Sequence, residues 1–321
     1  MVMEQSKKRL EIIQAAKLYY YGNMSQEQIG HLMGISRPRV SRLLTEARQL
    51  NIVKITVQDP QDSAESAARK LKQRFALKYV EVVPSGNNEE AAKSNVGRAA
   101  SKFLNEHISD HSKIGISWGT TLAAFTREFQ AKSQIPGARV VQLVGGTYIE
   151  NLNIDGRELV KVLAKKLGCA HSILQAPLVV HNAALRDLLM QEPAVIAHFE
   201  HIHSLDMAFV GIGTAYYKDS IAFRANYIEE AESRELGEKR LVCDICGHQL
   251  LADGTEPQTF LSNRIVGITL PELHQIPLVV GLCAGHKKAA PLAAALRGKH
   301  INAVILDEVS AIALMAAANT L

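Results

Sequence analysis

Short runs rich in β-branched residues alternate with helical stretches over most of the chain, from residue 76 to residue 321. We predict strands at 79–83, 113–117, 139–143, 207–211, 241–245, 264–268, 277–282 and 302–306. We predict helices at 89–106, 120–130, 155–167, 182–191, 287–297 and 308–318. This alternation is typical of an α/β domain with a mostly parallel sheet and helices on both faces.

Glycine and hydroxyl residues cluster where several of these strands end. The segment Ser117–Thr121 closes one strand and opens a helix, so that Ser117, Gly119, Thr120 and Thr121 can offer hydroxyls and backbone N–H groups to a phosphate or carboxylate. Gly145 and Gly146 close the next strand, and Lys287 and Lys288 lie just after another, so that a lysine could neutralise a bound anion. Ligands bind beyond the carboxyl ends of the strands in such sheets, so we predict one shared small-molecule site there.

Basic residues are concentrated at the N-terminus. Residues 1–57 hold nine Lys/Arg against four Glu, a charge of +5, whereas the whole chain is +4 and the remainder is therefore −1. A basic segment on a near-neutral body indicates a polyanionic partner for that segment alone.

The same segment has the pattern of two helices joined by a sharp turn. Ser25 and Gln28 form a capping box, Gly34 suits a turn with positive φ, and Ser36 caps a second helix. On that second helix the apolar positions recur at helical spacing and form a buried stripe: Val40, Leu43, Leu44 and Ala47. The pattern predicts a helix-turn-helix, and an ordinary helical hairpin with a solvated charged face is the alternative.

The exposed first turns of the second helix would enter the major groove of double-stranded operator DNA. The residues that we expect to contact DNA are Ser36, Arg37, Arg39, Ser41 and Arg42, with Arg39 on the flank. Arginine can bond guanine in bidentate fashion, and serine can bond a base or a phosphate. Lys54 would contact phosphates, and residues 52–57 could form a small wing.

Length and composition predict a two-domain protein. Within its 321 residues we expect a DNA-binding domain at 1–58, a linker helix at 59–76 and an effector domain at 77–321. There is no apolar run of about 18 residues and no signal peptide, so we expect a cytoplasmic protein without a membrane span. The four cysteines are expected to be reduced thiols.

Taken together, the motifs resemble the SorC family of bacterial sugar-binding transcriptional regulators, including its deoxyribonucleoside-regulator branch. The resemblance is carried by LYYYGNMSQEQIGHLMGISRPRVSRLL, GISWGTT, VVQLVGG, VGIGT, VCDICGH, NRIVGI, AGHKKAAPLAAALRG and INAVILDE. It implies a DNA-binding head and a Rossmann-like effector domain similar to sugar-phosphate isomerases and deaminases. It also implies a tetramer, a phosphorylated sugar or polyol as effector, and repression that the ligand relieves, with activation left open.

The resemblance also implies roles for individual residues. Ser117, Gly119, Thr120 and Thr121 would form part of a phosphate cradle, and Gly145 and Gly146 a second backbone wall. Lys288 would contact the anion, and Asp244 would accept hydrogen bonds from sugar hydroxyls. Asn263 and Arg264 would contact the ligand or stabilise the neighbouring loop.

Two positions depart from the family pattern. Cys243 stands where the family usually has glycine, which reduces local backbone freedom. Val144 stands where some relatives carry a lysine that can form an imine with an open-chain aldehyde. Because valine has no amine, we expect a closed-ring sugar phosphate or a polyol phosphate rather than covalent capture.

Two other interpretations of the chemistry compete with this one. A sugar-phosphate isomerase or deaminase would need a base, for which Asp244, His248 and His286 are candidates by residue type. A metal or redox site could use the CxxC spacing of Cys243 and Cys246. Nothing in the spacing marks a base, and a structural zinc normally needs four ligands, so we predict a regulator with no catalytic residue, metal or cofactor.

Overall fold

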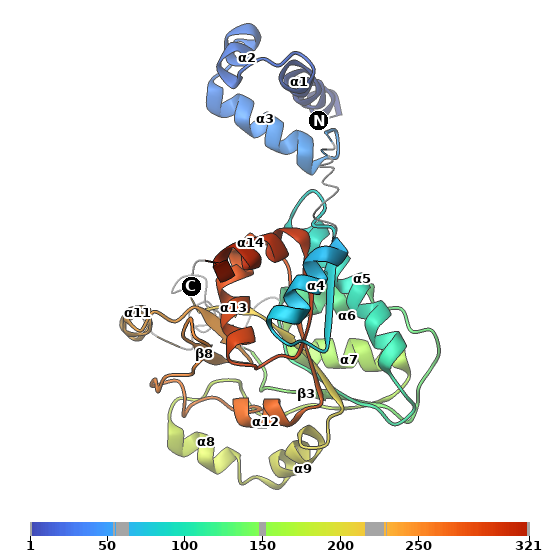
Figure 1. The fold of residues 1–321 in the computed structure, drawn as a ribbon, viewed down its shortest axis with the longest axis vertical. Helices are drawn as coiled ribbons and strands as arrows, with labels where there is room; N and C mark the ends of the chain where they lie inside the picture. The colour runs from blue at the N-terminus through green and yellow to red at the C-terminus, as the bar shows by residue number, and fades with distance from the viewer. Residues whose placement is uncertain are drawn as a thin grey trace. The chain divides into compact units, whose positions relative to one another are not determined.

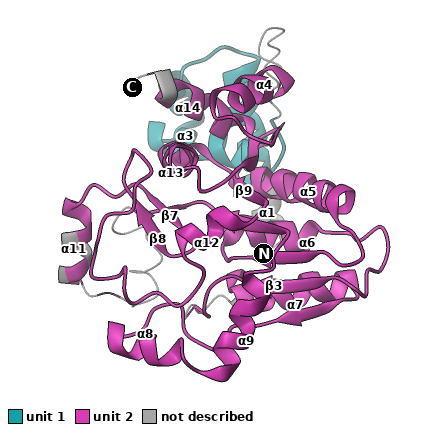
Figure 2. Cartoon of the chain, turned by 60° about the horizontal axis from the view of Figure 1, so that its bottom comes forward, with its two compact units in different colours: residues 1–60 teal, residues 61–321 magenta. Residues whose placement is uncertain are grey.

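A computed structural model describes residues 2–53, 55, 64–147, 152–215, 228 and 230–319 of the chain (Figure 1). The chain divides into two compact units, residues 1–60 and residues 61–321 (Figure 2). Within the described ranges no helix is both long enough and apolar enough to cross a membrane. The predicted phosphate contact Lys54 and most of the predicted wing at 52–57 lie outside the described residues.

The described part of the smaller unit consists of helices. These are α1 (Val2–Tyr20), α2 (Gln26–Met33) and α3 (Arg37–Gln49). The predicted stripe of α3 is buried, and it packs in one hydrophobic cluster with Ile29 of α2 and with Ile12, Ala15 and Ala16 of α1. The helix α1 therefore completes a core that two short helices could not enclose alone.

Local capping fixes the turn between α2 and α3. Ser25 Oγ accepts from the Gln28 N–H at 3.2 Å, and the Ser25 N–H donates to Gln28 Oε1 at 2.8 Å, which confirms the predicted capping box. Gly34 ends α2 in the left-handed conformation at φ 67°. A Cβ on Gly30 would lie 2.8 Å from the Ile35 carbonyl oxygen, so only glycine lets the turn approach α2 this closely.

The larger unit is built on a parallel sheet of seven strands in the order β1-β10-β9-β5-β2-β3-β4. The strands are β1 (Tyr79–Val83), β2 (Lys113–Ile116), β3 (Arg139–Gln142), β4 (Ala170–Ser172), β5 (Met207–Gly211), β9 (Leu278–Cys283) and β10 (Ala303–Asp307). From β2 the chain continues outward to β3 and β4, and from β5 it continues the other way to β9 and β10. The direction of winding thus reverses between β2 and β5, where such folds open a crevice for ligands.

Helices cover both faces of this sheet (Figure 1). One hydrophobic cluster joins the sheet to α5 (Glu89–His107), α6 (Thr120–Glu128) and α7 (Gly156–Leu167). Another joins it to α4 (Ala64–Arg74), α9 (Pro193–Ile202), α12 (Leu270–Gln275), α13 (Ala289–Arg297) and α14 (Glu308–Asn319). Along β5, Met207 and Phe209 enter the first cluster and Ala208 and Val210 the second, as the two-residue period of a strand requires.

The helix α4 falls in the segment that we predicted as a linker. Its apolar residues Ala67 and Leu71 are buried in the hydrophobic cluster of the larger unit. In the described structure α4 therefore belongs to the body of the larger unit.

A small antiparallel sheet follows β5. It consists of β6 (Gly213–Thr214), β7 (Cys243–Ile245) and β8 (His248–Leu250), with β7 in the middle. The strand that we predicted at 241–245 is therefore not part of the parallel sheet, because it turns back on itself at Cys246–Gly247. The predicted strand at 264–268 is also wrong: this segment makes only isolated bridges, from Ile265 and Gly267.

Shorter elements complete the described structure. They are η1 (Leu152–Ile154), α8 (Ala183–Leu189), α11 (Glu230–Glu238) and η3 (His286–Lys288). Of these, η1 and η3 lie next to the loops that follow β2 and β9, and so they help to position the candidate effector site.

Candidate DNA-binding face and effector site

The helix α3 presents a basic face to solvent. The residues predicted to contact DNA are all exposed: Ser36, Arg37, Arg39, Ser41 and Arg42. Ser36 occupies the N-cap position, but its side chain makes no capping hydrogen bond. Its hydroxyl and the arginine side chains are therefore turned outward, while the apolar side of α3 fills the core.

The arginines of this face differ in what they already contact. Arg39 forms an ion pair with Glu11 of α1, with 3.0 Å between Nη2 and Oε2. Among the residues that the structure describes, Arg37 and Arg42 form no ion pair. We therefore expect Arg37 and Arg42 to engage a nucleic acid more readily than Arg39.

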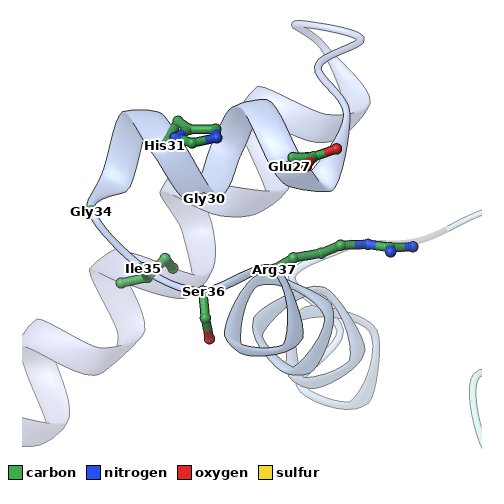
Figure 3. A pocket seen from close by; sticks show the side chains of 7 residues that line it. All are labelled: Glu27, Gly30, His31, Gly34, Ile35, Ser36 and Arg37. Atoms are coloured by element: carbon green, nitrogen blue, oxygen red, sulfur yellow. The ribbon is translucent and has the colours of Figure 1, made fainter.

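A hollow lies at the corner between α2 and α3 (Figure 3). It is lined by Glu27, Gly30, His31, Gly34, Ile35, Ser36 and Arg37. Figure 3 shows the Arg37 side chain extended away from the turn. The side chain can consequently reach a partner without any rearrangement of the turn.

Ser117 ties together the two strands that flank the winding reversal. Its N–H donates to the Phe209 carbonyl at 3.1 Å, and its Oγ accepts from the Gly211 N–H at 3.2 Å. Ser117 is almost fully buried. In the described structure its hydroxyl therefore holds the loop after β2 against the end of β5.

The next residues form the start of α6. Gly119 has φ 124°, a conformation that favours glycine, and its N–H donates to the Ile154 carbonyl at 3.0 Å. Thr120 is exposed and Thr121 is buried. Among the residues that the structure describes, no side chain caps α6, so the N–H groups of its first turn could bind an anion.

Gly145 and Gly146 lie at the neighbouring strand end, where they present backbone atoms and no side chain. Their N–H groups donate to the carbonyls of Val266 at 2.9 Å and Ala176 at 2.8 Å. A Cβ on Gly146 would lie 2.8 Å from the guanidinium carbon of Arg157. In a ligand site these glycines would therefore act through close packing rather than as N–H donors.

Arg157 is a cation at this edge that the sequence analysis did not identify. Asp155 holds it through Nε at 2.9 Å and Nη2 at 3.1 Å, and Thr147 donates to the same carboxylate. Burial opposes ionisation of Asp155, but the hydrogen bonds from Arg157 and Thr147 outweigh it and lower the pKa of this carboxyl. Asp155 was recognisable as a helix cap, but only the fold places its partner over Gly146.

Asp244 is buried in the middle strand of the small antiparallel sheet. Burial raises its pKa to about 6, although a hydrogen bond from the Gly247 backbone and the nearby positive charges of His248 and Lys288 act in the opposite direction. Asp244 and Lys288 are thus within electrostatic range of each other, although they are far apart in the sequence.

The loop that carries Lys288 is anchored on Asp307 at the end of β10. The Gly285 N–H donates to Asp307 Oδ1 at 3.0 Å, and Ser85 Oγ donates to Oδ2 at 2.6 Å. Lys288 itself is half-buried, whereas Lys287 is exposed. The buried Asp307 therefore positions a turn whose Lys288 lies within electrostatic range of Asp244.

His248 is buried between two hydrogen-bond acceptors. Its Nδ1 lies 2.7 Å from Glu256 Oε1 and its Nε2 lies 2.9 Å from the Ile268 carbonyl, and because both partners are acceptors both ring nitrogens must carry hydrogen. Burial disfavours this charge, but Glu256 and the Ile268 carbonyl outweigh it and raise the pKa of His248. A histidine with both nitrogens engaged is poorly suited to act as a base.

The remaining candidates have structural contacts. Arg264 donates to the Val180 carbonyl at 2.8 Å and to Glu232 at 3.3 Å, as a loop anchor would. Cys243, Cys246 and Cys283 are buried, and burial raises the pKa of each thiol. In the described ranges no group of three or more His, Cys, Asp or Glu residues is arranged to hold a metal ion.

Comparisons with known proteins cover nearly the whole chain. A family model described as a putative sugar-binding domain matches residues 59–316, and one described as sigma-70, region 4 matches residues 11–50. The chain is 30% identical over 314 residues to the deoxyribonucleoside regulator of Bacillus subtilis (strain 168), covering 98% of this chain and 99% of the relative. It is 28% identical over 314 residues to the sorbitol operon regulator of Klebsiella pneumoniae, covering 96% and 98% respectively.

A solved structure agrees with these sequence matches. The crystal structure of the full-length sorbitol operon regulator SorC from Klebsiella pneumoniae aligns with a TM-score of 0.73 at 28% identity, covering 97% of this chain and 99% of that chain. The fold, the basic helix-turn-helix and the α/β body thus define a DNA-binding transcriptional regulator with a sugar-binding domain, and not a sugar-phosphate isomerase or deaminase. The chain belongs to the sugar-binding domain family of SorC-type regulators.

Proposed function

We propose that this regulator represses a carbohydrate catabolic operon and that a phosphorylated sugar or polyol releases it. The observation that supports this proposal most directly is the set of groups around the winding reversal between β2 and β5. An N–H-rich helix start with two threonines suits a phosphate, and the buried carboxyl of Asp244 suits sugar hydroxyls. Lys288 would supply the positive charge between them.

The residue roles follow from this arrangement. The phosphate would lie at Thr120, Thr121 and the first turn of α6, beside Gly119. Ser117 would hold the loop in place, and Gly145 and Gly146 would let the opposite wall approach closely. Covalent capture of an aldehyde at Val144 is not part of this proposal, because that side chain has no amine.

On the DNA side, we propose that Ser36, Arg37, Arg39, Ser41 and Arg42 contact a cytoplasmic operator. One small DNA-binding domain reads only a short site, so regulators of this kind pair their DNA-binding domains on repeated half-sites by forming homo-oligomers. For this chain we propose a tetramer. Effector binding would favour one arrangement of subunits and thereby change operator affinity. This requires different effector affinities in the two arrangements.

A two-part experiment tests the proposal. A thermal-shift screen compares sugar and polyol phosphates with their unphosphorylated counterparts, since a ligand that binds the folded protein raises its melting temperature by mass action. Operator affinity is then measured with and without the best ligand. Stabilisation by a phosphorylated compound together with weaker operator binding is expected; stabilisation by unphosphorylated sugars alone would reject the phosphate cradle.

A further inference from the structure

One buried amide lacks a hydrogen-bond partner. Gln249 on β8 is 4% exposed, and its Oε1 is buried with no partner among the residues that the structure describes. Gln142, which is also fully buried, has both amide atoms paired: its Nε2 donates to the Val144 carbonyl at 2.6 Å and its Oε1 accepts from the Leu174 N–H at 3.1 Å. Since buried polar groups are normally satisfied, the Gln249 oxygen calls for a donor.

The register of the small sheet places Gln249 directly opposite Asp244. Gly213 of β6 pairs with Asp244 of β7, and Asp244 pairs with Gln249 of β8. Residues paired across antiparallel strands project to the same face, with Cα atoms about 4.5–5.5 Å apart. The face therefore carries a carboxyl, an amide and, at Gly213, no side chain at all.

The glycine in this row lets β6 approach Asp244 closely. A Cβ on Gly213 would lie 3.2 Å from the Cβ and the carbonyl oxygen of Asp244, tighter than most packed side chains allow. Any larger residue would press against Asp244 from that side. The row thus combines two hydrogen-bond acceptors with a glycine that adds no side chain of its own.

The same small sheet adjoins the proposed effector site. Cys246, in the turn between β7 and β8, lies close enough to Ser117 for the serine side chain to counteract the rise in the Cys246 pKa that burial causes, and Ser117 joins the ends of β2 and β5. Asp244 is also within electrostatic range of Lys288. The unpartnered oxygen of Gln249 therefore belongs to the same neighbourhood as the proposed cradle.

We propose that Gln249 contacts the effector and sets its specificity. Its Oε1 accepts a hydrogen bond from one effector hydroxyl, and Asp244 accepts from the adjacent hydroxyl. The effector would then be a phosphorylated sugar or polyol with two neighbouring hydroxyls, since two acceptors side by side require two donors. This inference rests on the proposed function and adds a second contact residue to it.

The test compares Gln249→Met with Gln142→Met in the full chain. The probes are ribose 5-phosphate, glucose 6-phosphate and glucitol 6-phosphate, their analogues lacking one hydroxyl, and inorganic phosphate. We expect Gln249→Met to keep or raise the melting temperature of the free protein, because it removes an unpaired polar atom, whereas Gln142→Met lowers it because it breaks two hydrogen bonds. Gln249→Leu repeats the measurement with a different shape.

Ligand affinity distinguishes a Gln249 that contacts the effector from a Gln249 that only supports the fold. Gln249→Met should weaken binding of the best phosphorylated probe by roughly 2- to 12-fold, the range for one neutral hydrogen bond. It should leave unchanged the affinity for inorganic phosphate and for the analogue that lacks the contacted hydroxyl.

Each contrary result has a distinct meaning. Unchanged affinity of both Gln249 variants for a probe that stabilises the wild type would reject the contact and keep the proposed function. Equal weakening toward all probes, with a lower melting temperature of the free protein, would make Gln249 a structural residue and also reject the contact. Failure of every phosphorylated probe to bind the wild type would overturn the proposed function and this inference together.

Discussion

The candidate DNA-binding face and the proposed effector site are assembled in opposite ways. The face comes from a single short stretch, residues 36–42, whose polar side chains are exposed before any partner arrives. The proposed effector site draws on several loops between Ser117 and Lys288, and two of its proposed polar contacts, Asp244 and Gln249, are already buried. An exposed group is well hydrated without a partner, whereas a buried one is not, so that an effector bound there would restore interactions that folding has removed.

This contrast has a consequence for specificity. Desolvated acceptors discriminate sharply between ligands that supply a donor and ligands that do not. Exposed arginines give strong but salt-dependent attraction to any duplex and read sequence only through correctly placed base contacts. We therefore expect narrow effector selectivity and a steep dependence of operator affinity on salt concentration.

The largest single effect should come from Lys288. We expect Lys288→Met to lower affinity for the best phosphorylated probe by about 1.5–3 kcal/mol, the contribution of a hydrogen bond to a charged group. Titration calorimetry gives the affinity, and Lys287→Met, on the exposed neighbouring residue, is the matched control. If both variants bind normally, the anion contact lies elsewhere.

Arg37→Ala and Arg42→Ala should have the next largest effect. Each should weaken specific operator binding by about 1–3 kcal/mol, the range for a bidentate base contact, and leave effector affinity intact. Operator titrations at several salt concentrations provide the measurement. Arg48→Ala, at the far end of the same helix, serves as control, and a loss as large in Arg48→Ala would argue against base contacts near the start of α3.

Effector affinity should also fall in acid. The ionised carboxylate of Asp244 accepts hydroxyl donors on both oxygens, so protonation as the pH drops through about 6 should reduce affinity by up to about tenfold per pH unit. Calorimetry between pH 5 and pH 8, values chosen to bracket the pKa, would show the change. Asp244→Asn should bind more weakly and without this pH dependence; an unchanged profile would assign the titration to another group.

The raised pKa of Asp244 should affect the stability of the free protein in the opposite direction. Because the folded chain holds this proton up to about pH 6 while the unfolded carboxyl releases it near 3.8, the contribution of Asp244 to the free energy of unfolding decreases as the pH rises between these values. Effector affinity and free-protein stability should therefore respond to Asp244 in opposite directions over this range.

The smallest effect concerns the pair Arg39–Glu11. Because Arg39 must loosen this exposed ion pair to reach DNA, Arg39→Ala should cost less operator affinity than Arg37→Ala, by about 0.2–1 kcal/mol. In a Glu11→Gln background the cost of Arg39→Ala should increase by a similar amount. A double-mutant cycle on operator affinity measures this coupling, and zero coupling would mean that the pair does not influence DNA binding.

Much of the fold follows from local sequence patterns. The predicted strands at 79–83 and 207–211 coincide with β1 and β5, and the predicted helix at 120–130 begins where α6 begins. Strand β6 has only two residues and β8 reads His-Gln-Leu, so neither shows a periodic pattern. The error at 241–245 arose because a β-rich run looks the same in a parallel sheet and in a hairpin.

The residues of the candidate site likewise divide into those that local sequence patterns predicted and those that they did not. Glycine and hydroxyl clusters at strand ends mark Ser117, Gly119 and Thr120 because their use is local to one loop. Arg157 and Gln249 carried no such signal, since their importance depends on which residues lie opposite them. A guanidinium placed over Gly146, and an amide oxygen without a donor, exist only once strands and helices are packed.

The sequence by itself determined the helix-turn-helix and its basic face, because capping, a left-handed glycine and the helical period act between residues a few positions apart. Tertiary structure alone decided that Gly213, Asp244 and Gln249 form one row and that Lys288 lies near it. The positions of these residues depend on strand register and on how the chain winds between β2 and β5. Strand register pairs segments that are far apart in the sequence, and it is fixed by which side chains the whole sheet buries.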